Sequence, residues 1–385
     1  MNSYRRLLAA LATVAVVLGG SADVVAQEVP VVIRVGGRVQ NDWAFFFADD
    51  DIEAVFGSLE DGTEFRRARI FIDGTIYENV GFRVQYDFAG GDADFKDVYI
   101  TLRDVPTLGT IRVGHQKEPL GLEVITSSKY LTFLERALPA ALLPERNTGF
   151  QVYNSGAHQR VTWALGVFRN ADSFGDASGN GEYNVSGRIT GLPIFEDEAN
   201  LVHVGASFSR QEPTDGILSL NSDPESHLAP DFVDTGDIPV DHVYLVGGEA
   251  AWVRGSLSLQ GEYVRAFVDR ADGTSPSFYG GYAQASFFLT GEHRRYRQSG
   301  AYFDRVRPVE NFGKDGGAGA WEIAVRYSML DLTDDGVVGG ELSGLTLGLN
   351  WYLNPNSRVM LNYSYSDLDG VGKSHIVQTR FQVDF

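Results

Sequence analysis

The sequence contains no cysteine in 385 residues, so the chain forms no disulfide and offers no thiolate ligand to a metal. Basic residues are also scarce, since 32 Lys and Arg stand against 51 Asp and Glu. The resulting net charge of −19 argues against a nucleic-acid-binding protein. Beyond Gly20 the sequence has no run of 18 apolar residues, which argues against a transmembrane helix.

The N-terminal residues have the pattern of a secretory signal peptide. A basic start precedes the uncharged apolar run 7–20, and small residues follow the run. The run is too short to span a membrane as a helix. We therefore predict a signal peptide over 1–26 and a mature domain over 27–385, with cleavage after Ala22 as the alternative.

Apolar and polar residues alternate along much of the remaining chain. In "WEIAVRYS" (321–328), Trp, Ile, Val and Tyr stand opposite Glu, Ala, Arg and Ser, which is the period of a strand with one apolar face. A soluble sandwich alternates in the same way. The polar face is small or charged, which suits a wet lumen, and aromatic residues lie near strand ends, which suits a membrane interface.

The predicted fold class is therefore all-β, a transmembrane antiparallel β-barrel. About 16 strands are expected near 31–41, 65–74, 80–88, 95–103, 109–116, 149–154, 160–169, 183–191, 200–209, 244–253, 257–268, 278–289, 320–329, 342–353, 357–366 and 375–385. An even number of strands puts both termini on one side, which we take as periplasmic. The long external loops are then 42–64, 170–182 and 210–243.

The connection 290–319 breaks this pattern, because it is long and yet lies on the periplasmic side. Either it is an unusual basic turn or the strand count is wrong by a hairpin. Its basic residues are Arg294, Arg295, Arg297, Arg305 and Arg307. Three roles remain open for them: attraction of anions at the exit, binding of a periplasmic partner, or solubility alone.

Seven stretches follow one another in order along the chain. They are "FRRARIFIDG" (65–74), "YDFAGGDADFKDVYI" (86–100), "GHQKEPLGLE" (114–123), "SSKYLTFLERALPAALLPERNTGF" (127–150), "LTGEHRRY" (289–296), "GAWEIAVRYS" (319–328) and "LGLNWYLNP" (347–355). Together they resemble the phosphate-selective porin O/P family of outer-membrane porins.

The resemblance implies a 16-stranded barrel in the outer membrane of a Gram-negative bacterium, a homotrimer, and a third external loop folded into the lumen. It implies a passive diffusion channel for small charged solutes, such as phosphate or other anions, with no cofactor. The terminal Phe385, on the apolar face of the last strand, resembles the signature that the outer-membrane assembly machinery reads. In physical terms the last strand must close onto the first, because lipid does not tolerate an open edge.

The segment 117–149 is the expected constriction, where charges act on a solute with little screening by water. The resemblance makes Lys129 and the region of Lys117 candidates for solute contact. Arg136 and Arg146 are further candidates, but pairs of Glu135 with Arg136 and of Glu145 with Arg146 would instead hold the segment to the wall.

Strand parity places a second group of candidates on the lumen face. Arginine binds oxyanions through two nitrogens, and rings of basic residues select anions in pores. The group comprises Arg34, Arg38, Arg67, Arg69, Arg83, Arg112, Arg188, Arg326, Arg358 and Arg380. Of these, Arg34, Arg38, Arg67, Arg69 and Arg112 join Lys117, Lys129, Arg136 and Arg146 as constriction candidates. Inward acids alternate with them at Asp87, Asp97, Glu249, Glu262, Glu322 and Asp384, so a mixed-charge wall with a purely structural role is the alternative.

The external loops point to the opposite selectivity. The segment 211–243 holds eight acids and no Lys or Arg, and 42–64 is acidic as well. An acidic vestibule repels anions over a Debye length of about 8–10 Å, which favours a cation-preferring or general porin. Divalent cations would bridge such loops, and 170–182 weakly resembles a calcium loop, although a flexible acidic loop explains the segment better.

No catalytic set emerges from the sequence. The seven histidines form neither an HExxH motif nor another ligand spacing, and no Gly-x-Ser-x-Gly occurs, so we predict no enzyme, no metal and no cofactor. A barrel enzyme or an adhesin that uses the long loops remains an alternative, which a measurement of ion conductance distinguishes from a channel.

Overall fold

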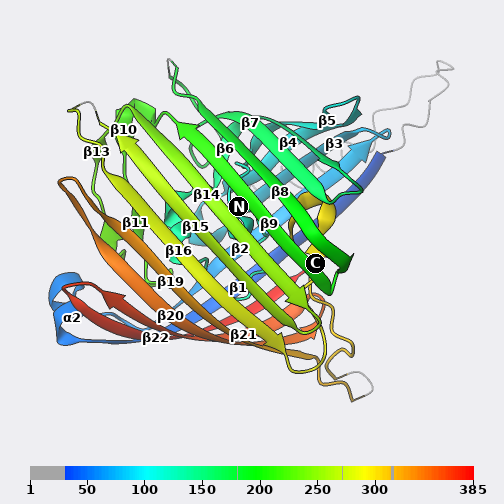
Figure 1. The fold of residues 1–385 in the computed structure, drawn as a ribbon. Coiled ribbons are helices and arrows are strands. Elements are labelled where there is room, and N and C mark those ends of the chain that lie inside the picture. Colours follow the sequence, from blue (N-terminus) through cyan, green and yellow to red (C-terminus); the bar gives the residue numbers. More distant parts are fainter. Residues whose placement is uncertain (1–30, 180, 271, 314–315) are drawn as a thin grey trace, which may run out of the picture.

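The computed structural model describes residues 31–179, 181–270, 272–313 and 316–385, so the predicted signal peptide lies outside the described residues. In these residues sixteen strands form one closed antiparallel barrel in chain order, and β22 pairs with β1 (Figure 1). The barrel strands are β1 (Val31–Ala48), β2 (Gly62–Ile76), β3 (Val80–Asp87), β4 (Asp94–Val105), β5 (Gly109–Lys117), β6 (Arg146–Gly156), β7 (Val161–Arg169), β8 (Asn184–Asp197), β9 (Asn200–Gln211), β14 (His242–Arg254), β15 (Leu257–Asp269), β16 (Ser277–Phe288), β19 (Ala320–Asp334), β20 (Val337–Asn354), β21 (Ser357–Leu368) and β22 (Gly372–Asp384).

Short elements occupy the connections. Two helices, α2 (Asp50–Phe56) and α3 (Leu122–Ile125), accompany the 3₁₀ turns η1 (Ala89–Gly91), η2 (Leu138–Leu142), η3 (Thr214–Gly216) and η4 (Gln298–Gly300). Three two-stranded ribbons join β10 (Ile217–Leu218) to β13 (Ile238–Pro239), β11 (Asn221–Ser222) to β12 (Val233–Asp234), and β17 (Tyr296–Arg297) to β18 (Tyr302–Phe303). Over the part of the chain that the structure describes, no helix is long and apolar enough to cross a membrane.

The predicted strand count is confirmed, and each predicted strand overlaps one observed strand. The first strand is longer than predicted, because Trp43, Phe45 and Phe47 continue the alternation as far as Ala48. The alternative that the strand count misses a barrel hairpin in 290–319 is wrong for the described residues. The strands β17 and β18 of this connection pair only with each other and not with the barrel.

The alternation is inverted relative to a soluble protein. In β19 the polar side chains of Glu322, Arg326 and Ser328 are buried, with at most 1% of each exposed. The apolar Ile323 and Tyr327 between them point outward and are 44% and 51% exposed. An apolar outer face with a polar interior is the arrangement of a barrel in lipid, because every strand must present hydrocarbon to the acyl chains.

The C-terminal residue completes the closure of the barrel. The backbone N–H of Gly37 donates to the carbonyl of Phe385 at 3.0 Å, and Phe385 donates back to Gly37 at 3.2 Å. A methyl group on Gly37 would collide with the carbonyl oxygen of Arg69 and lie 2.8 Å from the ring of Phe385. The seam therefore requires glycine at this position.

Gly37→Ala is expected to destabilise the folded barrel by about 1–3 kcal/mol, the cost of forcing atoms into a filled space. The loss is measured as a lower temperature for the shift in migration that unfolding causes on a detergent gel. Gly248→Ala is the matched control, because a methyl group there meets no atom within 4 Å. Equal transition temperatures for the two variants would contradict the packing argument.

Apolar packing fills the interior beside β14–β20. The turn η2 packs against β15, β16 and β19. Its Leu138 and Leu142 join Phe232, Val264 and Phe278 in one buried cluster. The open space in the barrel is consequently displaced toward β1–β8, where the cavity described below lies.

Candidate functional site

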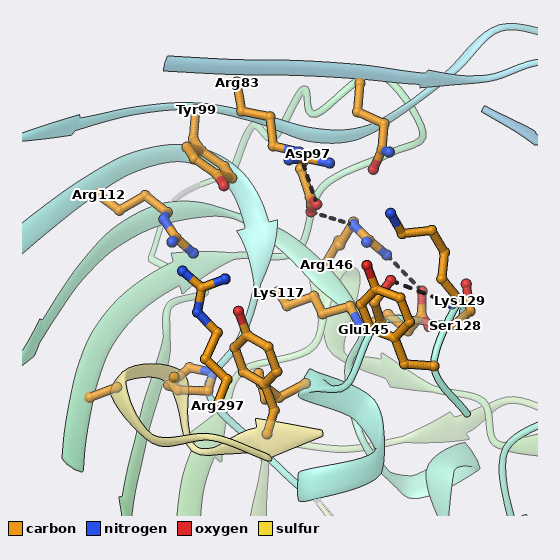
Figure 2. Close-up of a pocket in the computed structure, with 18 of the residues that line it drawn as sticks. Arg83, Asp97, Tyr99, Arg112, Lys117, Ser128, Lys129, Glu145, Arg146 and Arg297 are labelled. Atoms are coloured by element: carbon orange, nitrogen blue, oxygen red, sulfur yellow. Dashed lines mark hydrogen bonds and ion pairs between the residues drawn. The ribbon is translucent and has the colours of Figure 1, made fainter. Parts of the chain in front are cut away.

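A cavity of about 380 Å³ is lined by residues of β1–β8 and of two connections, the one between β5 and β6 and the one between β16 and β19. Eleven basic side chains but only three acidic ones line it, and Figure 2 shows several of them pointing into the space. The basic residues are Arg38, Arg67, Arg69, Arg83, Arg112, Lys117, Lys129, Arg136, Arg146, Arg188 and Arg297, and the acidic residues are Asp97, Glu145 and Asp304. This wall is strongly positive in a chain whose net charge is −19.

Nine residues were predicted as constriction candidates, and the structure brings eight of them to this cavity. They are Lys117, Lys129, Arg136, Arg146, Arg38, Arg67, Arg69 and Arg112. Arg34 is absent from the lining, because its side chain is 75% exposed and pairs with Asp73 at 2.9 Å. It shares a face of β1 with Arg38 but lies four residues away, about 13 Å along a strand.

Three of the cavity cations have no carboxylate within 4 Å in the described part of the chain: Arg38, Lys117 and Arg112. Arg38 donates from Nη1 to Ser128 Oγ at 2.6 Å, and Lys117 donates to the carbonyl of Val124. Arg112 donates to Tyr153 Oη at 3.0 Å. The partners of these three side chains are neutral, so no acid within 4 Å compensates them.

Other cavity cations are compensated by acids. Arg146 contacts Asp97 at 2.9 Å and Glu145 at 3.0 Å (Figure 2). Arg136 contacts the same Glu145 at 2.5 Å. Burial raises the pKa of Glu145, but attraction from Arg136 and Arg146 outweighs it and holds the pKa well below its usual range. Glu145 therefore stays charged and fixes both arginines to the wall.

The predicted pair of Glu135 with Arg136 is wrong. Glu135 instead contacts Arg66 at 3.0 Å and Arg380 at 2.6 Å, while Arg136 turns to Glu145. Arg66 of β2 and Arg380 of β22 already occupy the carboxylate of Glu135, and these partners come from strands distant in sequence. The predicted pair of Glu145 with Arg146 is present at 3.0 Å.

Lys129 lies at the cavity edge beside the closing seam. Its Nζ is 3.3 Å from Asp384 of β22 and 5.2 Å from the centre of the Tyr130 ring. Burial lowers the pKa of Lys129, and attraction to Asp384 only partly offsets this. Lys129 is therefore both a tether to the wall and a cation that a solute can approach.

The basic residues of 290–319 do not form one exposed patch. Arg294 is buried, lies 3.7 Å from the centre of the Phe303 ring and donates to Gln260 at 2.9 Å. Arg295 pairs with Glu198 at 2.7 Å, and Arg305 contacts Asp384. The connection folds back against the inner wall, so its charges meet acids and rings. Only Arg297 of this group lines the cavity, and Arg307 is exposed.

The acidic external segment is only partly a solvent-exposed vestibule. Glu225 is buried and accepts from Arg326 at 2.5 Å and from Thr346 at 2.9 Å, so it forms part of the interior. Other acids of this segment are exposed, among them Asp215, Asp231, Asp234, Asp237 and Asp241. In the described residues no group of three or more His, Asp or Glu side chains is placed to hold a metal ion.

The carboxyl group of Asp223 is expected to make the stability of the folded barrel depend on pH. Burial raises its pKa to about 7, and repulsion from Glu135 adds to the effect. The folded protein therefore binds a proton that the unfolded chain releases near pH 4. Stability must decline as the pH rises from about 4 to about 7, by up to about 1.4 kcal/mol per pH unit, less to the extent that solvent reaches the partly exposed carboxyl.

Asp223→Asn is expected to remove this decline. The measurement is the unfolding temperature in detergent at several pH values, with Asp237→Asn as the control at an exposed acid of the same segment. Parallel curves for the wild type and Asp223→Asn would show that the carboxyl is not held in its neutral form.

Sequence reasoning did not identify the aromatic part of the cavity wall. Its members are Phe71, Tyr99, Tyr130, Tyr153, Trp163 and Tyr302. The pairing of β5 with β6 is a signal that could have revealed Tyr153. In this hairpin Thr110 lies opposite Tyr153 and Arg112 lies opposite Gln151. Arg112 and Tyr153 are therefore diagonal neighbours on one face, within reach of each other.

Known proteins resemble this chain over nearly all of its length. The model of the family "Phosphate-selective porin O and P" matches residues 33–385. An uncharacterised protein of Caulobacter vibrioides is 31% identical over 88% of this chain and 69% of its own length. Porin O of Pseudomonas aeruginosa is 28% identical, with 91% of this chain and 86% of the relative covered.

Solved structures support the fold. An anion-selective porin from Comamonas acidovorans superposes with a TM-score of 0.57 at 14% identity, covering 92% of this chain and all of its own. The trimer form of OmpT from Vibrio cholerae gives a TM-score of 0.56 at 11% identity, covering 91% and 99% of the two chains. A closed barrel with an apolar outer face, a basic interior cavity and a family match over 33–385 lead to one conclusion: this chain is an outer-membrane porin of a Gram-negative bacterium and belongs to the phosphate-selective porin O and P family.

Proposed function

We propose that the porin is anion-selective and conducts small oxyanions, phosphate among them, by passive diffusion through the basic cavity. The observation that carries the proposal is the composition of the lining, with eleven basic and three acidic residues. Positive walls of low dielectric concentrate anions and exclude cations. Transport then needs only a concentration gradient, and the protein has no catalytic role.

The constriction in this proposal is the segment between β5 and β6, lying in the lumen as the infolded third external loop. Its contacts with distant strands support this position. Backbone N–H groups of Leu122 and Glu123 donate to Glu262 of β15 at 2.8 and 2.7 Å. Arg358 of β21 donates to the carbonyl of Leu131 at 2.7 Å. These residues belong to strands far from β5 and β6 around the barrel.

Three further features belong to the proposal. The mature protein assembles as a homotrimer, as the trimer form of OmpT does. Residues 1–26 are removed as a signal peptide, because of their basic start and apolar run. The assembly machinery recognises the C-terminal strand that ends at Phe385, whose apolar residues face outward.

The test is a reversal-potential measurement on the purified protein in a planar bilayer with a KCl gradient. Anion selectivity predicts stepwise conductance that reverses toward the chloride potential and that phosphate reduces. The exposed external acids favour the second candidate, a cation-preferring porin, for which the reversal would move toward potassium. Absence of conductance would contradict both candidates.

A further inference from the structure

Two arginines of the cavity face each other. Arg112 extends from β5 and Arg297 from β17, and Figure 2 shows their guanidinium groups pointing toward one another. Like charges that line one cavity repel, and the repulsion grows as water is excluded. Such an arrangement is stabilised by an anion between the two groups.

Arg112 has no carboxylate within 4 Å in the described structure, and Arg297 makes one long contact of this kind, with Asp304. The Nε of Arg112 is buried and has no hydrogen-bond partner among the described residues. Arg297 lies 3.9 Å from Asp304, beyond hydrogen-bond distance, and its side chain is 58% exposed. Both therefore retain donors for an oxyanion, which two guanidinium groups bind better than one.

Aromatic rings hold Arg112 in place. Its guanidinium carbon is 4.3 Å from the centre of the Tyr99 ring and 5.0 Å from that of Tyr153. Its Nη2 donates to Tyr153 Oη at 3.0 Å. Contacts on both sides fix the orientation of the group before any solute arrives, so less conformational entropy is lost on binding.

The cavity around the two arginines also contains aromatic side chains, which an inorganic oxyanion does not need for binding. Tyr302 and Trp163 line the same cavity, and about 380 Å³ falls within the range of sites for small organic ligands. Ring faces and edges interact favourably with a planar ring. Lys129 and Ser128 lie on the opposite side of the cavity in Figure 2, so this pair of arginines is a separate subsite.

We propose that Arg112 and Arg297 form a subsite for small aromatic carboxylates. The carboxylate lies between the two guanidinium groups and the ring lies against the tyrosines. This inference deepens the proposed anion pathway and rests on it. It makes Arg297 a specificity-determining residue, supplied by the periplasmic connection and not by the barrel wall.

The test uses the purified porin in a planar bilayer, with benzoate and acetate as blockers of the chloride current. Benzoate is expected to block wild-type protein at a concentration at least about tenfold below that of acetate, because only benzoate buries a ring. Equal blocking concentrations would overturn the assignment to aromatic carboxylates, and this result requires no variant.

Arg297→Gln is expected to raise the half-blocking concentration of benzoate by about tenfold, the effect of losing one charge-assisted contact. Arg307→Gln is the matched control, since it removes the same charge from an exposed position outside the cavity. An unchanged benzoate block in Arg297→Gln, or an equal loss in both variants, would overturn the subsite.

The reversal potential in KCl separates this inference from the proposed function. If wild-type protein selects chloride but benzoate block does not depend on Arg297, the anion pathway stands and the subsite fails. If wild-type protein selects potassium, the anion pathway itself fails and the subsite with it. Block by inorganic phosphate alone, with no effect of benzoate, would assign the cavity to inorganic oxyanions only.

Discussion

Replacing Arg38, Lys117 and Arg112 together by glutamine is expected to lower the permeability ratio of chloride to potassium by on the order of tenfold. These residues are the cavity cations without a carboxylate within 4 Å in the described structure, so no close acid compensates the charge that they carry. Glutamine keeps a hydrogen-bond donor at each position. The loss therefore reports the charge and not the collapse of the wall.

The matched control removes three charges from outside the cavity. Arg34→Gln, Arg254→Gln and Arg307→Gln change the net charge equally, and all three residues are exposed. This control is expected to leave the reversal potential near that of the wild type, because water and salt screen exposed charges within about 10 Å. A cavity triple variant that keeps wild-type selectivity would place the filter elsewhere, among the compensated arginines.

The fold was predictable because its main rule is local. A strand in lipid must present hydrocarbon at every second residue, so the alternation reveals the strands, their number and their faces without any long-range information. The same rule placed Arg38, Arg67 and Arg112 on the inner face, where they line the cavity.

Partners were not predictable, because they depend on which strands meet. Arg380 of β22 contacts Asp42 of β1 at 2.6 Å only because the barrel closes between the two ends of the chain. The position of an inward-facing residue along the barrel axis could not be predicted from the sequence either. Arg34 and Arg38 share one face and one strand, yet only Arg38 reaches the cavity.

The path of the connection 290–319 is a third feature that the sequence did not predict. The sequence left open an unusual basic turn or a missed barrel hairpin. The described residues form a turn outside the barrel sheet, and its return into the barrel was not predicted. That return rests on contacts with distant strands: Arg188 of β8 donates to the carbonyl of Ala301 at 2.9 Å, and Tyr296 lies within hydrogen-bond distance of His203 at 2.7 Å. No local period carries this information.

Arg326→Met is expected to destabilise the folded barrel by about 3–5 kcal/mol, the cost of leaving buried acids without their cation. Arg326 is 1% exposed and contacts Glu225 at 2.5 Å and Glu123 at 3.3 Å. It also donates to the carbonyl of Glu135 at 3.1 Å and lies 4.4 Å from the centre of the Phe133 ring. Methionine fills much of the volume, so the loss reports the charge.

The arginine holds two connections at once. Glu123 belongs to the segment between β5 and β6, and Glu225 to the external segment between β9 and β14. Loss of the shared cation removes an ion pair from each segment, so the single-channel current of Arg326→Met is expected to become noisy at potentials where the wild type is steady. Arg265→Met is the matched control, because Arg265 is exposed on β15 and its replacement should change stability by less than about 0.5 kcal/mol.

A second substitution separates charge from packing. In the Arg326→Met background, Glu225→Gln removes one of the unpaired charges, keeps one acceptor oxygen and gains an NH2 group that can donate to the other hydroxyl of the Ser328 and Thr346 pair. The double variant is therefore expected to unfold at a higher temperature than Arg326→Met alone, although Glu225→Gln by itself destabilises the wild type. Such a reversal of sign is the signature of a coupled pair in a double-mutant cycle. Additive losses would instead mean that Arg326 stabilises the barrel through its contact with Phe133, and that the two connections are held independently of each other.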